Sequence, residues 1–265
     1  MRIARFSVPD QTPRYGVIVG DPGDPDAVIT ELAGFPLPPF ELTATSHQLS
    51  QVRLLAPVVG SKIVAVGKNY ADHVREMGGD QAPADPVLFL KPSTSVVGPG
   101  DAIVLPALSS EVHHEAELAV VIGGIVRRVP VERALDAVLG YTCANDVTAR
   151  DLQRSDGQWT RAKGFDTFCP LGPWIETELD PSALELTCRV DGQLRQSAST
   201  ADLLRSVAEL IAFASAVMTL LPGDVLLTGT PAGVGPIVAG NRVEVTIEGI
   251  GTLHNFVVSD QVPGS

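Results

Sequence analysis

Cysteine is scarce in this sequence. The 265 residues include three cysteines, Cys143, Cys169 and Cys188, which lie far apart and form no Cys-x-x-Cys pair. An odd number of separated cysteines indicates neither a disulfide framework nor a zinc knuckle. Free cysteine is usually buried, so we predict three small buried thiols.

Long apolar runs are also missing. No stretch approaches the roughly 20 apolar residues that a membrane-spanning helix needs. Residues 1–7 lack the apolar core of a signal peptide. The composition is 45% hydrophobic and 19% charged, which suits a globular protein with one sizeable core and a small appended domain. We therefore expect a cytoplasmic protein.

Positive charge is in short supply. Nineteen basic residues stand against 31 acidic ones, which gives a formal net charge of −12. Nucleic acid and anionic membranes repel such a protein, so both are excluded as partners. An anionic substrate would need a local source of attraction, which a bound metal and one or two lysines would provide.

The first part of the chain differs from the rest. Residues 1–58 are rich in proline and contain two segments, 2–8 and 15–19, that predict short strands. A new apolar segment begins after Pro57. We predict a small N-terminal domain at residues 1–58 and a larger domain at 59–265.

The larger domain is predicted to be mainly β, of the α+β class, with a few accessory helices. Short apolar segments are bounded by Gly, Pro and Asp, as strands separated by turns are. Helical spacing predicts two helices, over residues 131–138 and 201–220, the second capped by Ser199 or Thr200. The predicted strands cover residues 87–90, 102–105, 118–122, 139–145, 186–190, 225–228, 242–248 and 252–258.

Three carboxylates carry the clearest chemical signal. Glu115 and Glu117 are two residues apart, so an extended strand turns both to the same face. Their charges repel unless a proton or a cation lies between them. Asp146 ends a second apolar segment and can supply a third carboxylate. Because Mg²⁺ and Mn²⁺ prefer oxygen ligands, we predict that these three residues hold one of these ions.

Other interpretations of these carboxylates are open. His113 shares the Glu115 face of an ideal strand and could be a fourth ligand, which would favour a softer metal. The Glu-x-Glu pair could instead lie at a solvated strand edge. A stabilising ion site with no open coordination position is a further alternative.

His73 and Glu76 are a candidate acid–base pair. They are three residues apart, so one helical turn makes them neighbours. A carboxylate beside an imidazole orients it and raises its basicity, which suits the activation of water. Gly78, Gly79 and the stretch that ends at Pro86 predict a segment that moves as a lid. A solvated ion pair is the alternative.

Several motifs occur together in one order along the chain. They are Gly67-Lys68-Asn69-Tyr70 with His73 and Glu76, Phe89-Leu90-Lys91-Pro92, His114-Glu115-Ala116-Glu117-Leu118, residues 145–153, Lys163-Gly164-Phe165-Asp166, and residues 228–235. In this order the chain resembles the fumarylacetoacetate hydrolase family from residue 62 to about residue 258. The resemblance is greatest to acylpyruvate hydrolases, oxaloacetate decarboxylases and 2-hydroxyhepta-2,4-diene-1,7-dioate isomerases.

The resemblance implies a mixed β-sandwich or roll that forms a homodimer around a Mg²⁺ or Mn²⁺ ion. It assigns the metal to Glu115, Glu117 and Asp146. The larger domain, residues 59–265, is then the catalytic domain. The N-terminal residues resemble the small leading domain of some bacterial members.

The resemblance also implies roles for five other residues. It places His73 and Glu76 on a lid that closes over the substrate, where they activate water. Lys163 would contact the 2-oxo acid end of the substrate, while Gln153 and Thr230 would help to line the pocket.

The implied activity is metal-dependent cleavage of a C–C bond in enolisable 2-oxo mono- or dicarboxylic acids, by hydrolysis or decarboxylation. An alternative reaction is 2-hydroxyhepta-2,4-diene-1,7-dioate isomerisation in aromatic catabolism. An alternative of another class is a noncatalytic module that binds oxo acids through its metal. His73 and Glu76 argue against this module, because a binding protein needs no base on a lid.

Overall fold

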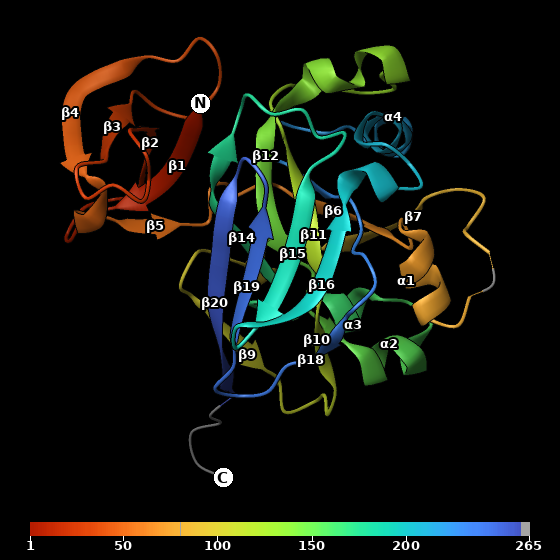
Figure 1. Cartoon of the computed structure of the whole chain (residues 1–265). Coiled ribbons are helices and arrows are strands. Elements are labelled where there is room, and N and C mark those ends of the chain that lie inside the picture. The colour runs from red at the N-terminus through yellow and green to blue at the C-terminus, as the bar shows by residue number, and fades with distance from the viewer. Residues whose placement is uncertain (80, 261–265) are drawn as a thin grey trace.

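The computed structural model describes residues 1–79 and 81–260, whose strands form three sheets (Figure 1). The sheets have 12, five and three strands. The five-stranded sheet lies in front of the large sheet in Figure 1, so these two sheets form layers. The fold is therefore the mainly β, mixed-sheet architecture that the sequence predicts. Residue 80 of the predicted lid and the last five residues of the predicted catalytic domain lie outside the described residues.

The N-terminal strands continue the large sheet on one side of the molecule, shown from red to orange in Figure 1. The first strand pairs antiparallel with a strand of the larger predicted domain, through Arg2 opposite Glu176 and Ile3 opposite Ile175. Division of the chain near residue 58 stays a prediction. The strands are β1 (Arg2–Ser7), β2 (Arg14–Val19), β3 (Val28–Leu32), β4 (Leu42–Gln48) and β5 (Arg53–Leu55), with a 3₁₀ turn at Leu49–Gln51.

An inner strand of the large sheet, β11 (Ala116–Ile122), is buried along its whole length. Leu118 and Val120 belong to the core that includes the five-stranded sheet, while Ala119 and Val121 belong to the core on the opposite face. A strand covered on both faces needs a continuous apolar run. β11 pairs with β12 (Val138–Asn145) and β17 (Val225–Leu227). The same sheet also contains β6 (Ile63–Gly67), β7 (Val87–Lys91), β14 (Cys169–Glu176) and β8 (Val96–Val97).

The two smaller sheets use strands from distant parts of the chain. The five-stranded sheet has the order β16 (Gln193–Ser199), β15 (Glu185–Val190), β19 (Arg242–Ile247), β20 (Gly251–Ser259) and β9 (Ala102–Leu105). The three-stranded sheet has the order β13 (Thr148–Ala149), β10 (Val112–His114) and β18 (Gly235–Pro236).

The predicted helix over residues 201–220 is wrong in its extent. The chain forms a 3₁₀ turn at Thr200–Asp202 and then α4 (Val207–Val217). Between them the chain is not helical, and Leu204 donates its backbone N–H to the carbonyl of Asn69 at 2.8 Å. Ser206 accepts from the N–H of Glu209 and starts the helix with a capping box, a signal that the sequence analysis overlooked.

The remaining helices are short. The predicted helix over 131–138 is a 3₁₀ helix at Val131–Ala137, and a 3₁₀ turn covers Ser93–Ser95. Two α-helices were not predicted, α2 (Arg150–Asp156) and α3 (Thr160–Lys163), and several strands were not, among them β14 and β16. Gly172 and Pro173 interrupt the apolar pattern of β14, and β16 is mostly polar. The predicted lid turn is α1 (Ala71–Glu76).

The cysteines are buried and free, as the sequence predicts. Burial raises the pKa of each of these three thiols to about 12, so they are protonated at neutral pH. No helix within the described ranges is long and apolar enough to cross a membrane.

Candidate functional site

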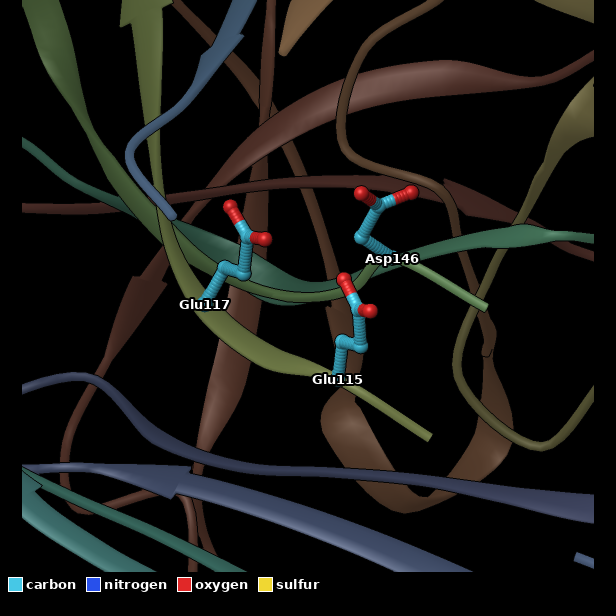
Figure 2. A group of neighbouring side chains, drawn as sticks. All are labelled: Glu115, Glu117 and Asp146. Atoms are coloured by element: carbon cyan, nitrogen blue, oxygen red, sulfur yellow. The ribbon is translucent and has the colours of Figure 1, made fainter. Parts of the chain in front are cut away.

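The three predicted carboxylates meet at the end of the central strands (Figure 2). Glu115 lies between β10 and β11, Glu117 lies in β11, and Asp146 follows β12. Since Ala116 pairs with Asn145, the antiparallel register brings Asp146 beside Glu115. One oxygen atom from each carboxylate lies within 4.8 Å of the other two, and all three residues are at most 3% exposed.

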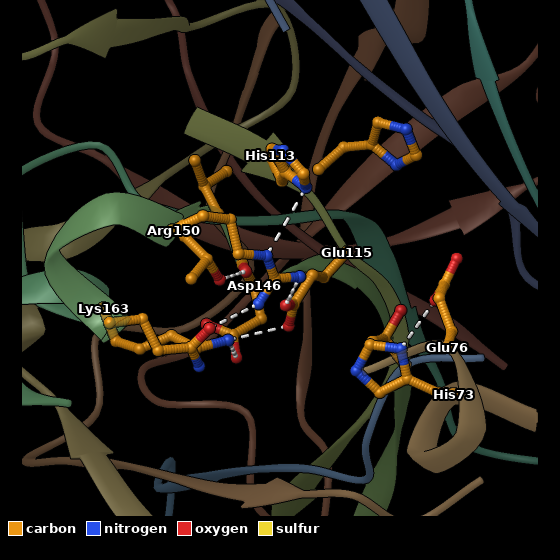
Figure 3. Close-up of polar contacts among 12 residues, drawn as sticks. His73, Glu76, His113, Glu115, Asp146, Arg150 and Lys163 are labelled. Atoms are coloured by element: carbon orange, nitrogen blue, oxygen red, sulfur yellow. Dashed lines mark hydrogen bonds and ion pairs between the residues drawn. The ribbon is translucent and has the colours of Figure 1, made fainter. Parts of the chain in front are cut away.

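Three buried cations contact two of these carboxylates (Figure 3 draws the contacts of Lys163 and Arg150). Lys163 Nζ donates to Glu115 Oε2 at 2.7 Å and to Asp146 Oδ2 at 2.6 Å. Lys91 Nζ donates to Asp146 Oδ1 at 2.6 Å, and Arg150 donates to Glu115. These bonds offset much of the cost of burying the charges.

Glu117 has a different environment. In the described part of the chain it forms no ion pair, and its Oε2 atom accepts a hydrogen bond from the backbone N–H of Gly229 at 2.6 Å. Burial and the nearby charges of Asp146 and Glu115 raise the pKa of Glu117 well above its ordinary value. Burial acts the same way on Glu115, but Arg150 and Lys163 outweigh it and lower the pKa of that carboxyl.

The arrangement fits a divalent cation. All three candidate ligands offer carboxylate oxygen, the donor type that Mg²⁺ and Mn²⁺ prefer. Lysine and arginine contact the other two carboxylates, but among the described residues none contacts Glu117, so this corner of the cluster lacks positive charge. A cation that replaces the Glu117 proton would supply that charge.

The carboxylates open onto a cavity of about 190 Å³. The lining includes three apolar residues, Met77, Phe89 and Trp159, of which the last two form one apolar wall. The rings of Phe89 and Trp159 meet edge to face with centroids 5.3 Å apart. Lys163 Nζ lies 5.1 Å from the Phe89 centroid, at the boundary between this wall and the charged floor. The cavity therefore combines an ionic end with an apolar side.

His73 brings an imidazole to the same cavity from α1. Its Nδ1 atom lies 3.0 Å from Glu76 Oε2 (Figure 3). The other Glu76 oxygen accepts from the N–H of Gly233 at 2.9 Å. A carboxylate only accepts hydrogen bonds, so Nδ1 carries the proton in this pair. The lone pair of a neutral His73 is then on Nε2, which makes this atom a candidate base.

Gln153 and Thr230 also line the cavity. Gln153 Oε1 accepts from Arg150 Nη1 at 2.7 Å, and Thr230 Oγ1 donates to the carbonyl of Ala116 at 3.0 Å. Seven of the eight site residues predicted from the sequence thus line one cavity. The eighth, Glu76, does not line it but contacts His73, which does.

His113 is not part of the carboxylate cluster. Arg150 Nε donates to His113 Nδ1 at 3.4 Å, and His113 Nε2 lies 3.2 Å from Glu111 Oε1. Burial and the Arg150 charge lower the pKa of His113. Its nearest polar partners are thus Arg150 and Glu111, and the group of three carboxylates does not include it.

The sequence analysis missed Gln196, a buried residue of β16. Its side chain contacts the backbone of Ala116, which is 80 positions earlier in the chain. No local pattern marks such a residue, because its position depends on how the five-stranded sheet packs on β11. Lys91 and Arg150 lie within the quoted motifs, but only the fold shows that they contact the carboxylates.

Two known families match this chain, each over a different part of it. Residues 62–258 match the family described as fumarylacetoacetate (FAA) hydrolase C-terminal. Residues 1–57 match the family described as Rv2993c-like, N-terminal.

Individual proteins are also similar to this chain over most of its length. The structure of 5-carboxymethyl-2-hydroxymuconate delta-isomerase from Mycobacterium smegmatis is 55% identical, with a TM-score of 0.92 over 98% of this chain and 100% of that one. Oxaloacetate tautomerase Fahd2a, mitochondrial, from Rattus norvegicus is 45% identical over 79% of this chain and 70% of its own length.

A third relative was solved with ligands. The maleylpyruvate hydrolase from Sphingobium sp. SYK-6, in complex with manganese(II) and pyruvate, is 37% identical and has a TM-score of 0.79. The alignment covers 98% of this chain and 100% of that one. Since the family match covers most of the chain, this protein belongs to the fumarylacetoacetate hydrolase family.

Proposed function

We propose that the protein is a divalent-metal-dependent enzyme that cleaves a C–C bond in enolisable 2-oxo acids, by hydrolysis or decarboxylation. One observation carries the proposal: the buried carboxylate cluster with Lys163 faces the same cavity as His73. A noncatalytic binding site would need the carboxylate cluster and Lys163 but would not need His73.

The ionic end of the cavity suits the 2-oxo acid group. When bound, Mg²⁺ or Mn²⁺ supplies Lewis acidity that stabilises negative charge on the oxygens of an oxo acid. Lys163 is held against two carboxylates, so its ammonium group is fixed where it can contact the substrate carboxylate. The maleylpyruvate hydrolase relative, solved with manganese(II) and pyruvate, supports this substrate class.

His73 supplies the base. Glu76 fixes its ring through Nδ1, and Gly233 in turn fixes Glu76. In hydrolysis, His73 Nε2 would take a proton from the water that attacks the distal carbonyl. The leaving fragment departs with the electrons of the broken C–C bond and is protonated as it leaves. Met77, Phe89 and Trp159 contribute an apolar surface that limits competing water.

Isomerisation is the second candidate. It needs proton transfer on the enol and no attacking water, and the same base and cluster would serve it. The M. smegmatis relative is named a delta-isomerase and the rat relative an oxaloacetate tautomerase, which favours this alternative.

A substrate panel tests these candidates. The protein with Mg²⁺ or Mn²⁺ is incubated with oxaloacetate, acylpyruvates and 2-hydroxyhepta-2,4-diene-1,7-dioate, and enol absorbance and CO₂ are followed separately. Loss of enol with release of a carboxylic acid supports hydrolysis, CO₂ release supports decarboxylation, and a change in absorbance without cleavage supports isomerisation. Binding without any turnover would support a noncatalytic oxo-acid-binding module.

A further inference from the structure

Trp159 packs against two strands of the large sheet at the wall of the cavity. Its ring meets Phe89 of β7 edge to face, with centroids 5.3 Å apart. A β carbon built on Gly67, the last residue of β6, would lie 2.6 Å from Trp159 Cζ3 and 3.0 Å from Trp159 Cη2. The ring therefore lies directly on the backbone of Gly67 and leaves no room for a side chain there.

Lack of space, and not backbone conformation, explains the glycine at position 67. The φ angle of Gly67 lies outside the left-handed region, so other residues could adopt it. Gly67 pairs with Val87 across β6 and β7, which holds its backbone in place. A methyl group added at Gly67 would therefore displace the Trp159 ring and leave the strand where it is.

The backbone of Trp159 leads directly to Lys163. Trp159 precedes the single helical turn α3, and its carbonyl accepts from the N–H of Lys163 at 2.9 Å. At the other end of the turn, the Lys163 carbonyl accepts from Lys91 Nζ at 2.6 Å. The turn is thus held at both ends, and a displacement of Trp159 reaches Lys163 through one hydrogen-bonded turn.

Gly67 also precedes the segment that carries His73. The next residue, Lys68, has a φ of +61°, so the chain turns sharply there before α1 begins at Ala71. The contact between Trp159 and Gly67 therefore joins the segment that carries His73 to the segment that carries Lys163. Trp159 is only half-buried, so burial in the core does not account for a large ring at this place.

We propose that Trp159 is a positioning residue that sets the place of the Lys163 ammonium group relative to His73. Its ring rests on Gly67, and its backbone fixes the start of α3. Two groups that act on one substrate need a fixed relative position, because misplacement by about 1 Å can lower a rate about 10²-fold. This inference rests on the proposed function, in which Lys163 holds the substrate and His73 is the base.

Two substitutions test the contact. Gly67→Ala introduces the methyl group that meets the ring. Trp159→Phe removes the outer ring atoms that would meet it, so the two changes should compensate each other. Gly124→Ala is the matched control, since a β carbon built at Gly124 has no heavy atom of the described residues within 4 Å. Melting temperatures establish that each variant is folded.

The first measurement is turnover of a 2-oxo acid by the Mn²⁺-loaded protein. Gly67→Ala should lower kcat about 10²-fold. KM should change less than kcat, because the three carboxylates stay in place. Trp159→Phe added to Gly67→Ala should restore most of the lost kcat, whereas Gly124→Ala should leave kcat unchanged.

The second measurement is urea unfolding of the metal-free protein, and it needs no turnover. The nearest atoms to the added methyl group belong to Trp159 and Phe89, and Lys163 is not among them. Without a link through Trp159, the effects of Gly67→Ala and Lys163→Met should therefore add. With the link, Lys163→Met should raise the unfolding equilibrium constant less in the Gly67→Ala protein than in the wild type, by roughly twofold or more. The difference should disappear in the Trp159→Phe protein.

Equal kcat values for Gly67→Ala and Gly124→Ala would overturn the inference, as would a double variant no faster than Gly67→Ala. Additive unfolding effects in the presence of Trp159 would also contradict it. Lys163→Arg, which keeps the charge, replaces Lys163→Met in the unfolding experiment if the latter does not fold. Failure of the proposed function is distinguishable: the wild-type protein would turn over no 2-oxo acid, while the unfolding experiment would still show the coupling.

Discussion

Lys163 Nζ lies 2.7 Å from Glu115 Oε2, and both side chains are almost completely buried. The same nitrogen contacts Asp146, so one ammonium group holds two candidate metal ligands together. Burial lowers the pKa of Lys163, but the Asp146 and Glu115 charges outweigh it and raise that pKa above its ordinary value. Lys163 is thus charged at neutral pH in the metal-free protein.

Lys163→Met should destabilise the metal-free protein. Removing one partner of a buried ion pair leaves an uncompensated charge, which costs about 3–5 kcal/mol of unfolding free energy. Urea unfolding in the presence of a chelator measures this loss, and added Mn²⁺ should recover part of it. Arg133→Met is the control, because its ion pair with Asp136 is exposed. Equal urea-unfolding midpoints for Lys163→Met and Arg133→Met would contradict the stabilising role of this lysine.

Metal binding should release a proton from Glu117. The folded-state pKa of this acid is raised from its ordinary value of 4.5 by burial and by Asp146 and Glu115. Between the two pKa values the folded, metal-free protein holds a proton that the unfolded chain has lost. Its stability therefore falls as the pH rises through this window, while the apparent Mn²⁺ affinity rises.

Calorimetry in two buffers with different ionisation enthalpies measures the released proton. The observed heat of Mn²⁺ binding should differ between the buffers for the wild-type protein. Glu117→Gln has no such proton to release and serves as the comparison. Identical heats in both buffers for the wild-type protein would contradict the prediction.

His73→Ala should separate catalysis from binding. Loss of a general base typically lowers kcat by about 10²- to 10⁴-fold. Oxalate affinity of the Mn²⁺-loaded variant should stay close to that of the wild type, because the carboxylate cluster is intact. His254→Ala is a suitable control, since His254 does not line the cavity. Unchanged turnover in His73→Ala would rule out His73 as the base.

Ser206→Ala should destabilise the protein through α4. Ser206 Oγ accepts from the backbone N–H of Glu209, while Glu209 Oε2 accepts from the backbone N–H of Ser206, so the substitution removes the serine side-chain half of the capping box. Loss of such a cap costs about 1 kcal/mol of unfolding free energy. Urea unfolding gives the value, with exposed Ser50→Ala as the reference. A loss no larger than that of Ser50→Ala would argue against this helix start.

The sequence predicts about half of the strands in the described residues, those whose signals are local. Residues 102–105 form a strand with the predicted limits, and the alternation in residues 242–248 corresponds to β19. β14 was missed because Gly172 and Pro173 break its apolar pattern. The break near Leu204 was missed because it depends on a contact with Asn69, more than 130 positions away.

The candidate site likewise combines residues that the local sequence predicts with residues that only the fold brings there. Glu115 and Glu117 are neighbours in sequence, so strand geometry alone predicts that they share a face. Lys91 and Gln196 reach the site from β7 and β16, and only the packing of these strands brings them there. Local spacing predicts the candidate ligands, whereas the groups that orient them depend on tertiary structure.

The central claim is that a metal held by Glu115, Glu117 and Asp146 supports turnover of a 2-oxo acid. The most direct test is the rate of enol consumption by the protein loaded with Mn²⁺, by the protein treated with a chelator, and by a Glu115→Gln variant. The loaded protein should turn over at least one 2-oxo acid. That turnover should be lost with the chelator, restored by added Mn²⁺, and strongly reduced in the variant. Equal rates with and without metal, or no turnover of any 2-oxo acid by the loaded protein, would contradict it.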